Sequence, residues 1–65
     1  MRNLTARDVL RLLREEGWYE VGQRGSHLYL EHPDRAGKLT VPMHRGTLKP
    51  GTLNSILKQS GLKGR

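Results

Sequence analysis

The stretch RGSHLYLEHP, residues 24–33, decides the fold of this chain. It opens near Gly25 and Ser26, which are residues typical of a tight turn. Apolar and polar residues then alternate over residues 27–32, which is the period of a strand with one buried face. The inward positions belong to Leu28 and Leu30. The opposite face carries His27, Tyr29 and Glu31. The stretch therefore predicts a strand that begins with a histidine pointing away from the core.

Strands are also predicted on both sides of this one. Residues 18–24, WYEVGQR, are rich in aromatic and β-branched side chains, and Gly22 among them indicates a bulge. Residues 33–37, PDRAG, have the composition of a type I turn. Residues 38–42, KLTVP, then form a third strand. Its inward side chains are Leu39 and Val41. Short turns between all three strands predict an antiparallel sheet.

Two registers of the second hairpin keep the inward residues on one face. The first register places His27 opposite His44. The second pairs Leu30 with Leu39, Glu31 with Lys38 and His27 with Pro42. In either register His27 and His44 come close together on the open face, provided that the strand stays extended through Met43. A bulge at Pro42 would separate the two histidines.

Helices are predicted at both ends of the chain. Residues 3–18 carry an apolar stripe at helical spacing. Its members are Val9, Leu10, Leu12 and Leu13. Thr5 is the expected N-cap, and Asp8 completes a variant of the capping box. Residues 50–61 carry a second stripe behind a proline suited to the first turn. The expected C-caps are Gly17 and Gly61.

The order helix, three strands, helix predicts a single α+β domain over residues 1–65, with a structured core at about 4–62. Two amphipathic helices on one face of a three-stranded antiparallel sheet form a two-layer sandwich, and the other face stays open to solvent. A chain this short buries only about 60% of its unfolded surface. It has no cysteine for a disulfide. We therefore expect marginal stability that a bound partner raises.

The charge of the chain limits the classes of ligand. The chain has twelve lysines and arginines and six acidic residues, which gives a net charge of +6. This excess favours a polyanion, above all nucleic acid, with a solubilising surface as the alternative. No apolar run reaches the roughly 20 residues of a membrane helix, and the first residues are too polar for a signal peptide. We expect a soluble cytoplasmic protein without a membrane partner.

His27 and His44 are open to two interpretations. A metal site lacks an obvious third ligand, although Glu31 shares their face, and we predict no metal and no other cofactor. General acid–base chemistry is the other interpretation, because the histidine pKa of about 6.5 suits proton transfer at neutral pH. Among so many cations the natural substrate is RNA. A 2′-hydroxyl deprotonated by histidine attacks the adjacent phosphate. A polar surface role is the structural alternative.

Candidate RNA contacts gather around the two turns. Arg24 precedes the first turn, whose amides can bind a phosphate oxygen, and Tyr29 can stack on a base. The second group lies in the loop at residues 43–51 and in the first turn of the helix that follows. The full set is Arg24, Gly25, Ser26, Tyr29, Arg45, Lys49, Gly51 and Thr52. Solvated loop cations and cross-strand packing of Tyr29 are the alternatives. We interpret Arg7, Arg11 and Arg14 as a solvated helix face rather than an RNA contact.

Several motifs together resemble the HicA family, the toxins of HicA–HicB toxin–antitoxin systems. The resemblance covers residues 4–62, and the combination is specific although each motif alone is weak. The motifs are GSH at 25–27, HP at 32–33, VPMH at 41–44, LKPGTLNSILKQSG at 48–61 and DVLRLLREEGW at 8–18. It implies a fold similar to the double-stranded RNA-binding domain. It also implies an mRNA interferase, an endoribonuclease that a HicB antitoxin masks.

The resemblance assigns the active-site histidine of the Gly-Ser-His motif to His27. The histidine after Val-Pro corresponds to His44, a candidate second proton-transfer group. Two positions depart from the family pattern. Leu28 stands where many members carry a polar residue, which agrees with the inward alternation. Asn54 stands where a basic residue is common, which weakens the case for RNA contact at the second helix. A non-catalytic RNA-binding module and an inactive toxin that still binds antitoxin remain the alternatives.

Overall fold

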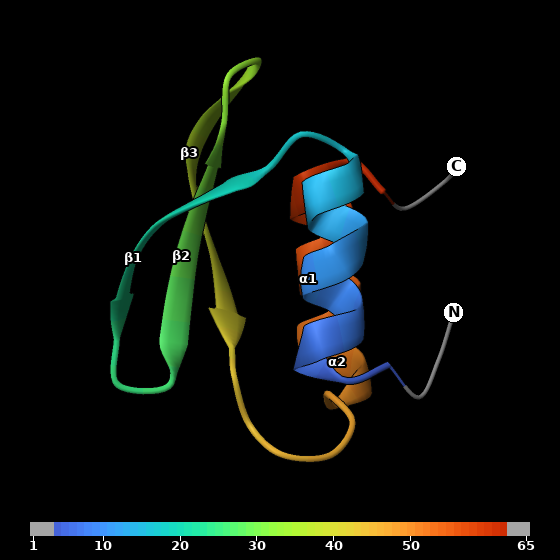
Figure 1. Cartoon of the computed structure of the whole chain (residues 1–65). Coiled ribbons are helices and arrows are strands. Elements are labelled where there is room, and N and C mark those ends of the chain that lie inside the picture. Colours follow the sequence, from blue (N-terminus) through green and yellow to red (C-terminus); the bar gives the residue numbers. More distant parts are fainter. Residues whose placement is uncertain (1–3, 63–65) are drawn as a thin grey trace.

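A computed structural model describes residues 4–62 and confirms the predicted order of elements. The elements are α1 (Ala6–Glu15), β1 (Tyr19–Arg24), β2 (His27–His32), β3 (Arg35–Pro42) and α2 (Pro50–Ser60). The strands form one antiparallel sheet in the order β1-β2-β3. Both helices lie on one side of this sheet (Figure 1). The fold is therefore the predicted two-layer α+β sandwich with one open face.

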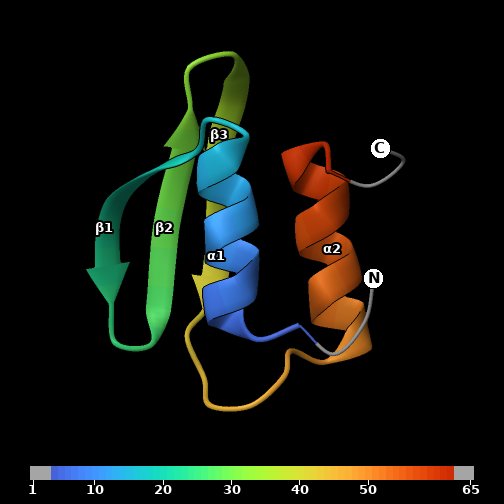
Figure 2. The ribbon, with the colours of Figure 1, turned by 45° about the vertical axis from the view of Figure 1, so that its right-hand side comes forward.

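The helices do not cover the sheet evenly. In Figure 2, α1 lies in front of β3, α2 lies beside it, and β1 forms the opposite edge of the sheet. Consistent with this placement, all six residues of β1 are exposed. Its inward positions, opposite Leu28 and Leu30, hold Gln23 and Glu20 rather than apolar residues. Glu20 instead forms an ion pair with Arg14 of α1. β1 is thus attached to the molecule mainly through its hydrogen bonds to β2.

The core lies between the helices and strands β2 and β3. The inward residues of both strands are buried, as the alternation predicts: Leu28, Leu30, Leu39 and Val41. The helices contribute most of the remaining core: Ala6, Val9, Leu10, Leu13, Leu53, Ile56 and Leu57. Leu12 is only half-buried. Trp18 was expected at the start of the first strand, but β1 begins at Tyr19 and the Trp18 side chain packs into the core.

The register of the second hairpin is the second of the two predicted ones. His27 lies opposite Pro42, and Leu30 lies opposite Leu39. The register then shifts, because His32 lies opposite Arg35. Three residues of β3 therefore face one residue of β2 at this shift, and the predicted pairing of Glu31 with Lys38 falls within it. The predicted turn over residues 33–37 is wrong in extent, because β3 already begins at Arg35.

The first hairpin contains the predicted bulge. The register shifts between Glu20 and Gly22, which leaves Val21 as the extra residue of β1. A bulge of this kind bends and twists an edge strand. This accounts for the course of β1 in Figure 1, where the strand curves away from the helices.

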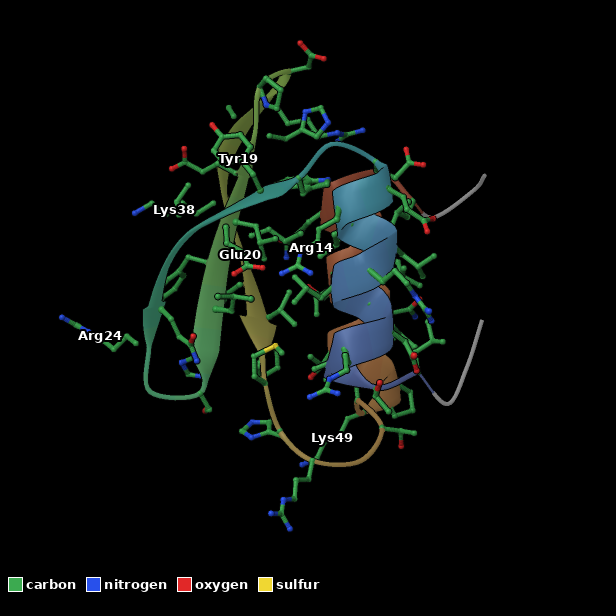
Figure 3. All side chains as sticks on the ribbon, viewed as in Figure 1. Arg14, Tyr19, Glu20, Arg24, Lys38 and Lys49 are labelled. Atoms are coloured by element: carbon green, nitrogen blue, oxygen red, sulfur yellow. The ribbon has the colours of Figure 1, made fainter. Side chains whose placement is uncertain are left out.

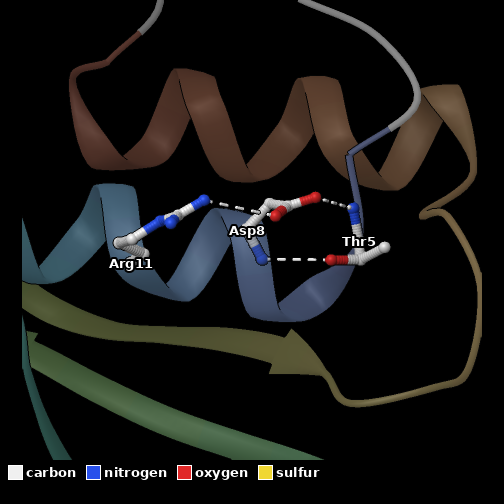
Figure 4. Close-up of polar contacts among 3 residues, drawn as sticks. All are labelled: Thr5, Asp8 and Arg11. Carbon is white, nitrogen blue, oxygen red and sulfur yellow. Dashed lines mark hydrogen bonds and ion pairs between the residues drawn. The ribbon is translucent and has the colours of Figure 1, made fainter.

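The ends of the helices follow local chemistry. The Asp8 amide donates to the Thr5 hydroxyl at 3.1 Å, and the Thr5 amide donates to the Asp8 carboxylate at 3.0 Å (Figure 4). This confirms the capping box at the start of α1. The C-cap of α1 is Glu16 rather than Gly17, which follows it with a φ of 101°. Gly61 is the C-cap of α2, with a φ of 84° that favours glycine.

His32, the last residue of β2, has a structural role. Its Nε2 lies 2.8 Å from the Glu16 carbonyl oxygen, and its Nδ1 accepts from the Asp34 amide at 3.0 Å. The imidazole also meets the edge of the Trp18 ring, with the ring centroids 5.3 Å apart. The side chain thereby joins the end of α1 to the turn between β2 and β3. It differs in this respect from the other two histidines.

The capping box makes the stability of the protein depend on pH. The hydrogen bond from the Thr5 amide holds the pKa of Asp8 below its ordinary value. A carboxylate with a lowered folded pKa stabilises the protein above its unfolded pKa, about 3.9, and loses this effect as the pH falls through the folded pKa. We expect Asp8→Ala to melt at a lower temperature than the wild type at neutral pH.

The melting-temperature difference should shrink as the pH is lowered through the acidic range and should disappear once the carboxylate is protonated in both states. Thermal melts followed by circular dichroism at a series of pH values measure this difference. Glu15→Ala, which removes an exposed carboxylate from the last turn of the same helix, is the control. A difference that stays constant with pH would contradict the assignment.

Candidate functional site

One end of the molecule collects the segments that the sequence singled out. The turn between β1 and β2, the loop between β3 and α2, and the first turns of both helices all lie at this end (Figures 1 and 2). The Met43 amide donates to the Ser26 carbonyl oxygen at 2.6 Å, which joins the loop to the turn. The Leu48 amide donates to the Leu4 carbonyl oxygen at 2.8 Å, which joins the loop to the start of α1.

Positive charge is concentrated at this end, which we call the basic end and define by its four cations: Arg7, Arg24, Arg45 and Lys49. Of the six acids in the chain, Asp8 alone lies in the first turn of a helix, and its carboxylate is engaged in the capping box. The other five acids lie at the C-terminal end of α1, on β1 and β2, and in the turn between β2 and β3. The N-termini of both helices point to the same end and add partial positive charge. The basic end is therefore suited to an anion.

His27 stands at the rim of the basic end, as the first residue of β2. Its side chain is exposed, and its neighbours across the sheet are Arg24 of β1 and Pro42 of β3. Because directly paired residues share a face, Arg24 and His27 both lie on the open face. Figure 3 shows Arg24 pointing away from the helices. Within residues 4–62 no hydrogen bond or ion pair engages the imidazole, so both of its nitrogens are accessible to a ligand.

Tyr29 follows two residues along β2 on the same face and is half-buried. Its neighbour on β1 is Gly22, which has no side chain to cover the flank of the tyrosine ring. A Cβ atom built at Gly22 would meet nothing within 4 Å. Sequence reasoning missed a second aromatic side chain on this face, that of Tyr19, which lies opposite Glu31 and is 49% exposed. Only the register between β1 and β2 shows that Tyr19 lies on the open face.

His44 does not lie on a strand. β3 ends at Pro42, so the extended strand on which the predicted proximity to His27 depended stops two residues earlier. His44 and Arg45 instead line two hollows next to the helices. One hollow, of about 380 Å³, also has Arg7 in its lining. The other, of about 500 Å³, also has Lys49 and Thr52 in its lining. His27 lines neither of these hollows, so the structure groups His44 with the helix starts.

The start of α2 has the features of an anion-binding site. Lys49 is the N-cap and offers no side-chain hydrogen bond to the helix, and the first turn contains no acid. The amides of the first turn, which include those of Gly51 and Thr52, have no partners within the helix. Figure 3 shows Lys49 at the same end of the molecule. These groups, together with Arg45 across the hollow, provide both charge and donors for a phosphate.

Comparison with known proteins assigns the family. A family model described as the HicA toxin of bacterial toxin–antitoxin matches residues 6–62, from the first residue of α1 to beyond the end of α2. The match places the chain among the toxins of bacterial toxin–antitoxin pairs. Within that class, the chain belongs to the HicA toxin family, as the sequence motifs indicated. A search of curated proteins returned no match. In the described part of the chain, neither helix is long and apolar enough to cross a membrane.

Proposed function

We propose that this toxin is a metal-independent endoribonuclease, an mRNA interferase, in which His27 moves the proton at the cleaved phosphodiester. One observation carries the proposal. The histidine of the Gly-Ser-His motif is exposed on the open face beside Arg24, at the rim of the basic end, and no side chain of residues 4–62 engages it. A solvent-accessible imidazole next to a guanidinium supports proton transfer at a bound phosphate.

The reaction follows from these groups. His27 takes the proton from an RNA 2′-hydroxyl, and the 2′-oxygen attacks the adjacent phosphorus. The bond from phosphorus to the 5′-oxygen breaks, which leaves a 2′,3′-cyclic phosphate. The departing 5′-oxygen receives a proton from His44 or from water. Arg24 stabilises the negative charge that builds up on the phosphate oxygens.

The remaining predicted contacts bind the RNA on either side of the cleaved phosphodiester. The turn residues Gly25 and Ser26 lie beside His27 and offer backbone groups to the cleaved phosphate. Tyr29 stacks on a base in the space left by Gly22. The second group holds a neighbouring phosphate at the start of α2: Arg45, Lys49, Gly51 and Thr52.

The test is cleavage of a long single-stranded RNA by the purified protein in excess EDTA, with His27→Ala prepared in parallel. Cleavage by the wild type alone supports the proposal. Cleavage by both proteins would indicate a contaminant or a different catalytic group, with His44→Ala as the next variant. Wild-type activity that appears only when a divalent cation is added would contradict metal independence.

A non-catalytic RNA-binding module is the second candidate. It is favoured by the solitary imidazole, since within residues 4–62 no carboxylate or carbonyl orients the His27 ring. Such a module would tolerate His27→Ala, and its RNA binding would weaken steeply as salt is raised. Cleavage by neither protein, together with salt-sensitive binding by both, would favour this candidate.

The partner that belongs to a toxin of this class is an antitoxin, and we propose a HicB-type protein that covers the open face in the cytoplasm. Covering this face would bury His27 and block RNA. It would also add contacts to a small core. We expect the complex to melt at a higher temperature than the free toxin.

The expected stabilisation is about 2.7 kcal/mol when the free antitoxin is at 100 times its Kd. For a domain of this size, this corresponds to a rise in Tm of about 11–22 °C. Differential scanning calorimetry of the toxin with increasing antitoxin measures the shift, and an unrelated acidic protein at equal concentration is the control. An unchanged Tm at saturating antitoxin would contradict the proposal.

A further inference from the structure

Three arginines repeat at helical spacing on α1, and the structure distinguishes them. Arg11 pairs with Asp8 at 3.5 Å, and Arg14 pairs with Glu20 of β1. Arg7 is exposed, and within residues 4–62 it forms neither an ion pair nor a side-chain hydrogen bond. Within the described residues, no acid therefore neutralises the charge of Arg7. The regular spacing of Arg7, Arg11 and Arg14 in the sequence does not predict this difference.

The exposed side chain of Arg7 also borders a hollow in the surface. It lines the hollow of about 380 Å³ between the start of α1 and the loop at residues 43–46. His44 and Arg45 line the same hollow from the loop side. None of the residues in its lining is acidic. The nearest carboxylate along the helix, that of Asp8, accepts hydrogen bonds from Thr5 and Arg11. The hollow therefore combines two guanidinium groups with a polar loop.

This hollow is linked to His27 through the start of the loop that follows β3. Pro42 lies opposite His27, and the Met43 amide is bonded to Ser26. Arg45 follows Pro42 by three residues, so its Cα lies within about 11 Å of that of Pro42. Thr5 pairs with Thr47 in an isolated bridge, which brings the start of α1 to the same loop. The hollow thus lies at the same end of the molecule as His27 and is joined to it through the turn and the loop.

From this geometry we propose that the hollow is a further phosphate subsite, in addition to the one at the start of α2, and that Arg7 and Arg45 hold the RNA backbone there beyond the nucleotide that is cleaved. The inference rests on the proposed function, because it takes the phosphate at His27 as its starting point. It assigns to Arg7 a role in positioning the substrate that its paired neighbours on α1 do not share. The RNA accordingly runs across the basic end and onto α1.

The experiment measures the affinity of the full chain for a short single-stranded RNA that is 2′-O-methylated throughout. This RNA lacks the attacking hydroxyl and stays intact. Fluorescence anisotropy gives the affinity at a series of salt concentrations for the wild type, Arg7→Gln, Arg45→Gln and Arg11→Gln. Arg11→Gln is the matched control, because it removes an equal charge from the same helix outside the hollow. Thermal melts establish that all four proteins are folded.

We expect Arg7→Gln and Arg45→Gln each to weaken binding about three- to tenfold and to reduce the slope of log K against log salt by about 0.7, the value for one single-strand phosphate contact. Arg11→Gln should keep the wild-type slope. Equal losses in Arg7→Gln and Arg11→Gln would overturn the inference in favour of a diffuse field. Unchanged RNA affinity in Arg7→Gln with weakened antitoxin binding would overturn it in favour of a protein-docking site.

The same measurements separate this inference from the proposed function. Arg7-dependent binding of the methylated RNA by a toxin that fails to cleave unmodified RNA would support the subsite and contradict the catalytic role. Cleavage that depends on His27, together with binding that is indifferent to Arg7, would support the catalytic role and contradict the subsite. Failure of the wild type to bind RNA would overturn both.

Discussion

Replacing Leu30 by alanine is expected to lower the free energy of unfolding by about 3–4 kcal/mol, because it removes a fully buried side chain and leaves a cavity. Leu30 is 0% exposed and lies on β2, the central strand, between the other two strands and the helices. A chain of 65 residues has a total stability of about 3–10 kcal/mol. The substitution therefore removes between about a third and all of the stability of the free toxin.

Urea denaturation followed by circular dichroism measures the effect. Leu12→Ala is the matched control, because it is the same chemical change at a half-buried position of α1. The control should lose clearly less stability, since less apolar surface returns to water. A Leu30→Ala protein that unfolds at the same urea concentration as Leu12→Ala would show that the core is not centred on β2.

The second large effect concerns the reaction. His27→Ala is expected to lower kcat for RNA cleavage by about 10²–10⁴, the range attributed to general acid–base catalysis by a positioned side chain. The Tm should stay close to that of the wild type, because the imidazole is exposed and unengaged within the described residues. Single-turnover cleavage of a labelled RNA gives the rate, and anisotropy with the methylated RNA gives the affinity. A fall in affinity without a fall in rate would contradict the role.

The other two histidines sharpen this test. His32→Ala should lose stability, because the imidazole bonds to Glu16 and Asp34 and packs on Trp18. Its folded fraction should retain the wild-type rate. His44→Ala separates the two roles that remain for that residue. A lower kcat would support proton donation to the departing oxygen, whereas a higher KM with unchanged kcat would support a phosphate contact in the loop.

The candidate site is spread over segments distant in the sequence, and this explains why sequence reasoning recovered it unevenly. His27 could be placed on the open face because its strand alternates strictly with Leu28 and Leu30. The position of His44 depended on where β3 ends, and the strand stops at Pro42. The sequence did not place Tyr19 on the open face, and it assigned Arg7 to a solvated helix face, because the surroundings of both residues come from β2 and from the loop rather than from their own elements.

By itself, the sequence determined the type and order of the elements, the faces that β2 and β3 bury and the N-terminal capping of α1. These properties depend on periods of two or 3.6 residues and on contacts within one turn, which neighbouring side chains specify. The tertiary structure alone decided the bulge in β3, the exposure of β1 and the difference between Arg7 and its paired neighbours. Each of these depends on how the hairpins and the two layers pack against one another, for which the sequence has no regular short-range period.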